Sequence, residues 1–209
     1  NLYAQDIEGK EDIKHLYELT SNQIYSTPYI VNKTLPLLHS RFSLAQPYIL
    51  IDIGGATTDI HYSKDLVDDN MVITNEFDRL VFKKLGVFKS RESLIFAAQN
   101  NEFVYELLAH LKVTENIFEE KSTKSLKILM QLAIFLVLCK VSEYKKAYIN
   151  LKLNSINSIV FTGGITKVIN KDEISTIVEF FYTKILNSKH NPNLVLDENY
   201  DIWTIENKD

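Results

Sequence analysis

The chain has 209 residues, of which 45% are hydrophobic and 24% charged, and its formal net charge is −4. This length suits one ample domain, and the composition excludes an intrinsically disordered chain. The 23 Lys and Arg residues against 27 Asp and Glu residues provide no basic field, so we expect neither nucleic acid nor a membrane surface as a partner. A lone cysteine, Cys139, and no signal-peptide pattern at the start predict a cytoplasmic protein with a buried thiol.

The first third of the chain predicts leading helices followed by a β-hairpin. Hydrophobic periodicity favours helices over residues 1–45, with a break at Pro28. The apolar run 48–53 is typical of a strand buried on both faces. Residues 57–62 predict a second strand, and the short glycine-containing turn between the two runs predicts a hairpin. A short strand is expected at 71–74.

The middle of the chain has a helical pattern. It extends from residue 90 to residue 141, with a break near Val113. The part from Leu126 to Tyr144 is apolar almost all round, which predicts a central position in the core. Its most apolar stretch has about a dozen residues, whereas a membrane-spanning helix needs about 20. We therefore predict a core helix.

The last quarter predicts alternating strands and helices. A buried strand is expected at 158–162, a helix around 165–170, a further helix at about 173–186, and a strand and turn within 193–203. No repeat or flexible linker interrupts the chain. Because the chain starts at Asn1 rather than Met, we expect it to be a piece of a longer protein.

Glycine is scarce, and four of the six glycines stand in two pairs. The first pair, Gly54-Gly55, follows Asp52 at the end of a buried strand. Backbone N–H groups in such a turn can point at phosphate oxygens, and the hydroxyls of Thr57 and Thr58 add donors. A strand-end aspartate can hold magnesium through its water shell. A plain hairpin turn requires neither the aspartate nor the threonines, so the pattern favours a phosphate site.

The second pair, Gly163-Gly164, joins a buried strand to a helix after Thr162. Open α/β sheets bind nucleotides at the carboxyl ends of their strands. Alone, this corner is as typical of a tight turn as of a binding site. Together with the first pair it predicts one cleft that takes both ends of an adenine nucleotide.

The two motifs together resemble the second lobe of the actin, heat-shock chaperone and sugar kinase superfamily. The string from Asp52 to His61, Asp-Ile-Gly-Gly-Ala-Thr-Thr-Asp-Ile-His, is most similar to the glutamate mutase accessory proteins, the MutL-type reactivating proteins. The resemblance covers residues 20–205 and includes Arg79, Gly86 and the segment from Leu196 to Tyr200. It implies an α/β, ribonuclease H-like lobe with a mixed central sheet flanked by helices.

In that lobe the chain divides into four consecutive parts of one domain, residues 1–209. The leading helices occupy 1–45, the phosphate hairpin and a strand 46–75, a helical part 90–150, and the adenosine motif with a C-terminal helix and strand 156–205.

The resemblance implies an ATP-binding protein that services a cobalamin-dependent mutase such as glutamate mutase. Its implied cofactors are ATP and magnesium, its implied partners an adenine nucleotide and the mutase, and a homo-oligomer is compatible with the sequence. The implied catalytic residues are Asp52, near magnesium, and Thr57, near the γ-phosphate. The implied nucleotide-binding residues are Gly54, Gly55, Ala56, Thr57, Thr58, Thr162, Gly163 and Gly164.

Three departures from the superfamily pattern leave hydrolysis open. No first phosphate motif precedes Asp52, and residues 25–28 carry no carboxylate where chaperone ATPases have their base. Lys83 and Lys84 stand where the family pattern leads us to expect acidic residues. An ATPase is therefore expected only if a preceding lobe supplies the missing motif.

Three alternatives remain open at this point. One is a lobe of a hydantoinase or oxoprolinase-type enzyme, which carries a similar hairpin. Another is a non-enzymatic actin-like module that senses nucleotide or assembles into filaments, and the third is a degenerate pseudo-ATPase. The histidines show no metal-ligand spacing, and His61 is expected to face solvent or a neighbour rather than phosphate.

Overall fold

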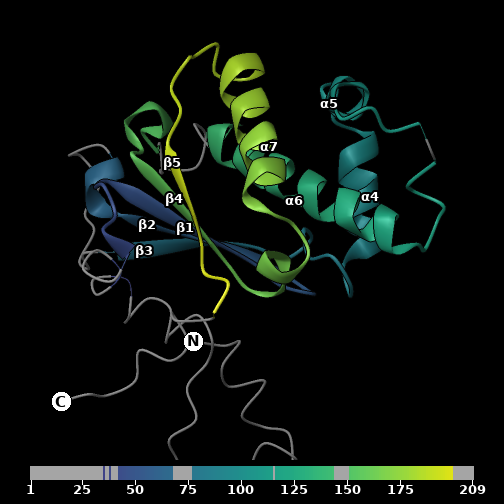
Figure 1. Cartoon of the computed structure of the whole chain (residues 1–209), viewed down its shortest axis with the longest axis horizontal. Helices are drawn as coiled ribbons and strands as arrows, with labels where there is room; N and C mark the ends of the chain where they lie inside the picture. Colours follow the sequence, from purple (N-terminus) through teal and green to yellow (C-terminus); the bar gives the residue numbers. More distant parts are fainter. Residues whose placement is uncertain are drawn as a thin grey trace, which may run out of the picture.

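The structure is a computed structural model that describes residues 35, 38, 42–67, 77–114, 116–143 and 151–199 (Figure 1). Most of the expected leading helices and the expected strand at 71–74 lie outside these residues.

A five-stranded mixed sheet forms the centre of the described part, in the order β3-β2-β1-β4-β5. The strands are β1 (Tyr48–Ile53), β2 (Thr58–Ser63), β3 (Phe77–Phe82), β4 (Ser158–Thr162) and β5 (Asn193–Leu196). β1 pairs antiparallel with β2 and parallel with β4, β2 pairs antiparallel with β3, and β4 pairs parallel with β5. The predicted hairpin and the predicted buried strands at 48–53 and 158–162 are confirmed.

The strand β3 was not predicted from the sequence. Its register against β2 brings Leu80 opposite Ile60, so burial of this apolar pair on one face of the sheet holds β3 in place. Pairing with a preformed hairpin therefore decides this strand more than its own pattern does.

The main helices are α4 (Arg91–Gln99), α5 (Val104–His110), α6 (Thr123–Glu143) and α7 (Lys171–Lys184). The predicted break near Val113 is confirmed, and a second break at residues 100–103 separates α4 from α5. Figure 1 shows α6 and α7 alongside the sheet.

Three short 3-10 helices complete the described elements. They are η1 (Lys64–Leu66), η3 (Leu153–Ser155) and η4 (Gly164–Lys167). The helix expected around 165–170 is therefore a single 3-10 turn. The next helix, α7, begins at Lys171 because a capping box fixes its start: Glu173 N donates to Asn170 Oδ1 at 2.9 Å, and Asn170 N donates to Glu173 Oε2 at 3.0 Å.

Alternate residues of β1 face two different apolar clusters. Ile49, Ile51 and Ile53 belong to the large core that includes α6 and α7. Tyr48 and Leu50 face the other side of the sheet, where helical residues such as Leu35 and Leu38 pack on them. Both faces of the central strand are thus covered at this end, as its continuous apolar run predicts.

The helix α6 is long and apolar enough to cross a membrane by length and composition. Most of it is buried in the core, against α4 and α7. It has 21 residues, longer than the dozen-residue apolar run in its centre, and it occupies the central position predicted for residues 126–144.

Candidate functional site

The structure brings the two glycine corners together at one edge of the sheet. β1 and β4 are adjacent and parallel, and Asp52 on β1 lies in register with Thr162 on β4. The chain therefore leaves both strands at the same edge, through Gly54 and Gly163. The approach is close: a β-carbon on Gly163 would lie 2.5 Å from Asp52 Oδ1. Gly163 also has a φ of +86°, which favours glycine, so this corner needs a residue without a side chain for two reasons.

The hairpin turn, residues 54–57, is braced from one side by the loop 83–90, which we call the bracing loop. All three carbonyl groups of Gly54, Gly55 and Ala56 accept hydrogen bonds from this loop. The bonds run from Val87 N to Gly54 O (3.2 Å), from Phe88 N and Lys89 N to Gly55 O (2.9 and 2.8 Å), and from Ser90 Oγ to Ala56 O (2.8 Å).

This bracing decides where the amides of the turn point. A trans peptide is planar, with its C=O and the following N–H on opposite sides, so the N–H groups of Gly55, Ala56 and Thr57 face away from the bracing loop. Within the described residues these three amides donate no hydrogen bond, and all three residues are partly exposed. Successive backbone N–H groups that lack partners form a concavity suited to an anion.

The amide of Gly54 differs from the three that follow it. It closes the hairpin by donating to Thr57 O at 2.9 Å, so it is not available to a phosphate. Gly54, one of the two glycines predicted to contact phosphate, therefore uses its amide to close the turn. Thr57, predicted for its hydroxyl, contributes a backbone amide that has no acceptor within the described residues.

Gly86 allows the bracing loop to reach the turn. A β-carbon at this position would lie 2.3 to 2.6 Å from the backbone atoms of Ala56, closer than real β-carbons come. The sequence offered Gly86 only as a weak point of resemblance. Its contact with Ala56 is tertiary, between residues 30 positions apart, and no local pattern indicates it.

Two carboxylates face each other beside the turn. The register of the hairpin places Asp52 on β1 directly opposite Asp59 on β2, so both side chains lie on one face of the sheet. Burial, and secondly the charge of Asp59, raise the pKa of Asp52 to about 7. Burial also raises the pKa of Asp59, against the opposing effects of the Thr57 hydroxyl and Arg79. Thr57 Oγ1 donates to Asp59 Oδ2 at 3.0 Å, and Arg79 lies 3.9 Å from Asp59 Oδ1.

The pair has the chemistry of a magnesium site completed by a ligand. Within the described residues Asp59 Oδ1 is buried and accepts no hydrogen bond. Ionisation of Asp52 is opposed by its burial and, secondly, by the charge of Asp59. Mg²⁺ prefers one or two carboxylates, several waters and phosphate oxygens. No group of three or more His, Cys, Asp or Glu side chains in the described residues could hold a metal by itself. The residues therefore fit a magnesium ion that phosphate and water complete.

Sequence reasoning did not name Asp59 as a site residue, although Asp59 closes the quoted motif. The spacing of seven residues between Asp52 and Asp59 could have indicated it. With a four-residue turn, positions 52 and 59 become cross-strand partners, and the hairpin places their side chains on the same face.

Thr58 lies on the opposite face of the hairpin from the two aspartates. It is fully buried, and its hydroxyl donates to Leu85 O at 2.9 Å. This bond ties the hairpin to the bracing loop. The Thr58 hydroxyl therefore does not face the two aspartates, where the sequence predicted that it would contact phosphate. We assign Thr58 to the packing of the hairpin.

The second corner is held by a buried aspartate. Thr162 is fully buried and its hydroxyl donates to Asp197 Oδ2 at 2.9 Å. The hydrogen bond to Asp197 thus holds the end of β4, from which the corner begins. Asp197, just after β5, is 1% exposed and was not singled out for the site. Gly164 is different, because a β-carbon there would meet nothing within 4 Å. Open space therefore adjoins this corner at Gly164.

His61 lies two residues along β2 from Asp59, opposite Leu50 on β1 and Arg79 on β3. It is 1% exposed, and burial, followed by the charge of Arg79, lowers its pKa to about 3. Its imidazole is therefore neutral at physiological pH and packs within the sheet layer, consistent with the expectation of a contact to a neighbour.

Comparison with known proteins places the chain in a family. No curated protein sequence matches it. Among solved structures it is similar to the activator of the 2-hydroxyisocaproyl-CoA dehydratase from Clostridium difficile with bound ADPNP, at 16% identity and a TM-score of 0.27. That alignment covers 74% of this chain and 56% of the activator, so the chain spans little more than half of its length. The model of a family described as MutL protein matches residues 1–130, which include the whole phosphate hairpin. Since this match spans more than half of the 209 residues, the chain belongs to the MutL protein family.

Proposed function

We propose that this chain is the ATP-binding lobe of an actin-like ATPase, and that it acts as an accessory protein that reactivates a cobalamin-dependent mutase such as glutamate mutase. Membership of the MutL family supports the accessory role. The observation that carries the nucleotide site is the hairpin turn, in which three successive amides without partners stand beside the Asp52–Asp59 pair.

The sheet supports the actin-like part of the proposal. Only β2 runs against the direction of the other strands, and β1 and β4 lie side by side in the middle. A ribonuclease H-like lobe is expected to have such a mixed sheet, with its phosphate hairpin and its later strand ending at one edge. Ligands of α/β sheets bind beyond the carboxyl ends of adjacent parallel strands, which is where the two glycine corners lie.

Each part of a magnesium nucleotide has a matching group in this arrangement. The amides of Gly55, Ala56 and Thr57 suit the phosphate oxygens, and the open space beside Gly164 suits the adenosine. Asp52 and Asp59 would hold the magnesium ion, Asp52 through water. When bound, the ion neutralises phosphate charge. It also lowers the free-energy cost of ionising Asp52, because an opposite charge favours the ionised carboxylate.

Binding and hydrolysis are separate properties, and the proposal concerns binding. The Thr57 hydroxyl is held by Asp59, and the His61 imidazole is buried and neutral. Neither side chain is therefore poised in the described structure to activate a water molecule.

Isothermal titration of magnesium-ATP into the protein tests the proposal. We expect saturable binding that Asp52→Ala weakens by about tenfold or more in the presence of magnesium, since a carboxylate–metal contact is lost. Without magnesium the same variant should bind ATP at least as tightly as wild type, because the ionised carboxylate then only repels phosphate.

Two further variants sharpen the titration. Gly164→Val adds a side chain where no protein atom lies within 4 Å of the β-carbon, so it should leave the melting temperature unchanged while it weakens ATP binding. Glu179→Gln changes an exposed carboxylate on α7 and serves as the control. Equal ATP affinities for wild type, Asp52→Ala and Gly164→Val would contradict the proposed site.

A further inference from the structure

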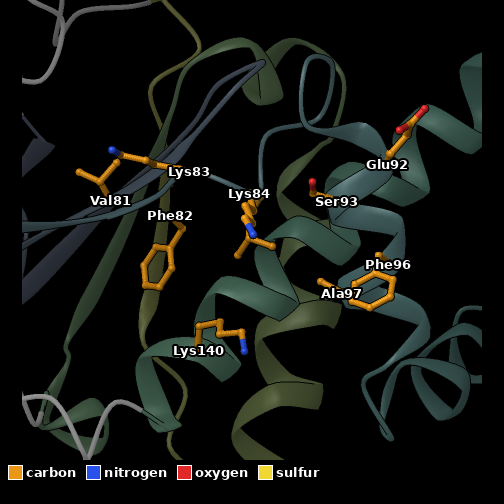
Figure 2. A pocket seen from close by; sticks show the side chains of 10 residues that line it. Val81, Phe82, Lys83, Lys84, Glu92, Ser93, Phe96, Ala97 and Lys140 are labelled. Carbon is orange, nitrogen blue, oxygen red and sulfur yellow. The ribbon is translucent and has the colours of Figure 1, made fainter. Parts of the chain in front are cut away.

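A cavity lies beside the start of the bracing loop, at Lys83, Lys84 and Leu85. It has a volume of about 570 Å³ and opens between the end of β3, the helix α4 and the end of α6 (Figure 2). Figure 2 shows the Phe82 ring on one side of it and Phe96 with Ala97 on the other, with Lys84 and Lys140 between them. None of the residues of the two glycine corners lines it.

The charge at this cavity is opposite to that of the whole chain. Lys83, Lys84 and Lys140 line it, and Glu92 is the acidic residue among its lining. All three lysines are exposed, and within the described residues Lys83 and Lys84 form no ion pair. A local excess of positive charge on a chain of net charge −4 favours an acidic ligand.

Two of the apolar side chains that line the cavity are exposed to solvent. Phe96 is 69% exposed and Val81 is 40% exposed, and both line the cavity. A pocket for a small molecule buries most of its ligand among its apolar walls. Here an aromatic side chain, Phe96, is left largely exposed, and aromatic side chains are enriched among the residues that anchor protein partners.

We propose that this cavity docks an acidic segment of a partner protein that carries apolar side chains between its carboxylates. The carboxylates pair with Lys83 and Lys84, and the apolar side chains pack between Phe82 and Phe96. Three lysines around one cavity make too small a basic surface for nucleic acid or an anionic membrane, both of which need extended positive fields. The identity of the partner as a mutase rests on the proposed function, whereas docking of the segment does not need nucleotide.

The bracing loop connects this cavity to the hairpin turn. Lys83 and Lys84 form the cavity wall at the start of the loop, and the rest of the loop holds the turn. Ser90 Oγ joins the two ends, since it contacts both Lys83 O (3.2 Å) and Ala56 O (2.8 Å). A docked segment therefore contacts the same short loop that orients the amides of the turn.

Fluorescence anisotropy with a labelled eight-residue peptide of alternating glutamate and leucine tests the proposal, with no nucleotide present. We expect saturable binding by the 209-residue chain that weakens as salt rises. The double variant Lys83→Glu/Lys84→Glu should weaken it at least tenfold, and Phe96→Ser should also weaken it. Lys121→Glu/Lys189→Glu makes the same change of charge at exposed lysines outside the cavity and should bind as wild type does. Melting temperatures of all variants report that they are folded.

Three outcomes overturn the proposal. The first is equal binding of the acidic peptide and a peptide of alternating lysine and leucine. The second is equal loss of binding in the cavity variant and in the control variant. The third is that vesicles with anionic phospholipid, or a single-stranded RNA, bind through Lys83 and Lys84 while the acidic peptide does not. Because no ATP is present, failure of nucleotide binding leaves each of these results unaffected.

Discussion

Asp52 is a carboxylate in a position that opposes its ionisation. It sits at the end of a buried strand, opposite a second carboxylate, and burial is the main reason that its pKa is raised to about 7. If no cation binds at this position, replacing Asp52 by a neutral side chain of similar size should stabilise the folded protein. A buried carboxyl group at this position is therefore consistent with a bound cation that favours its ionised form.

The pH dependence of stability should report this cost. The pKa of Asp52 is about 7 in the folded chain and near 3.8 in the unfolded chain, so between these values the folded state binds the extra proton. The free energy of unfolding contributed by Asp52 must therefore fall as pH rises from about 4 to about 7, and then level off. Asp52→Asn removes this dependence, and should be more stable than wild type at pH 8 by up to roughly 4 kcal/mol.

Urea denaturation at pH 5, 6, 7 and 8 measures the effect. The stability gap between Asp52→Asn and wild type should widen with pH, whereas Glu179→Gln, an exposed change on α7, should follow wild type. A gap that stays constant over this range would show that Asp52 does not titrate near neutral pH. Added magnesium-ATP should narrow the gap at pH 8, because it binds the wild type more tightly and therefore stabilises it more than the variant.

At the scale of elements, the bracing loop and the hairpin turn form one unit. The turn has no regular structure of its own, and its peptides are oriented by four hydrogen bonds from the loop. The approach of the two segments depends on Gly86, where a β-carbon would overlap the backbone of Ala56. The site is thus built by packing between segments about 30 residues apart.

Gly86→Ala should disturb this unit. The added methyl group must push the bracing loop from the turn, and overpacking of this kind costs about 1–3 kcal/mol. We expect a lower melting temperature and weaker magnesium-ATP binding, because the amides of the turn lose their orientation. Gly164→Ala is the matched control, since its methyl group meets no atom within 4 Å and should leave the melting temperature unchanged.

Calorimetric scans and titrations of the two alanine variants distinguish the possibilities. If Gly86→Ala melts at the wild-type temperature and binds ATP normally, the close contact between Gly86 and Ala56 is not what holds the turn.

At the scale of the whole molecule, the two faces of the sheet differ in what packs on them. One face packs on α6 and α7 through the large apolar core. The other face carries a smaller apolar cluster that includes Tyr48 and Leu50. On this face also lie Asp52 and the buried polar groups Asp59 and His61, on alternate rungs of β1 and β2. The apolar face makes the sheet rigid, and a rigid sheet can keep two adjacent corners in a fixed relation for a ligand.

Hydrogen exchange should show how a ligand uses this frame. Magnesium-ATP is expected to protect the amides of Gly55, Ala56 and Thr57, which have no hydrogen-bond acceptor in the described structure. The amides of Val87 and Phe88 already donate to the turn and should change much less. Mass spectrometry of peptides that span residues 50–62 and 80–92 measures both. Protection confined to the second peptide would contradict the assignment of the phosphate site.

The sequence alone determined the hairpin, the buried strands and the central helix. An unbroken apolar run such as 48–53 has few alternatives to a strand covered on both faces, and two glycine pairs in a chain poor in glycine mark positions of special backbone geometry. The string from Asp52 to His61 was also enough for the family resemblance, which the match over residues 1–130 confirms.

The tertiary structure decided which groups the site contains. Register made Asp59 the partner of Asp52, long-range hydrogen bonds removed the Thr58 and Thr162 hydroxyls from the ligand side, and the bracing loop opened the amides of the turn. These outcomes depend on contacts between segments 25 or more residues apart, or on which face of a strand a side chain takes. A local pattern fixes the backbone type of a segment, but only packing fixes what its side chains and amides face.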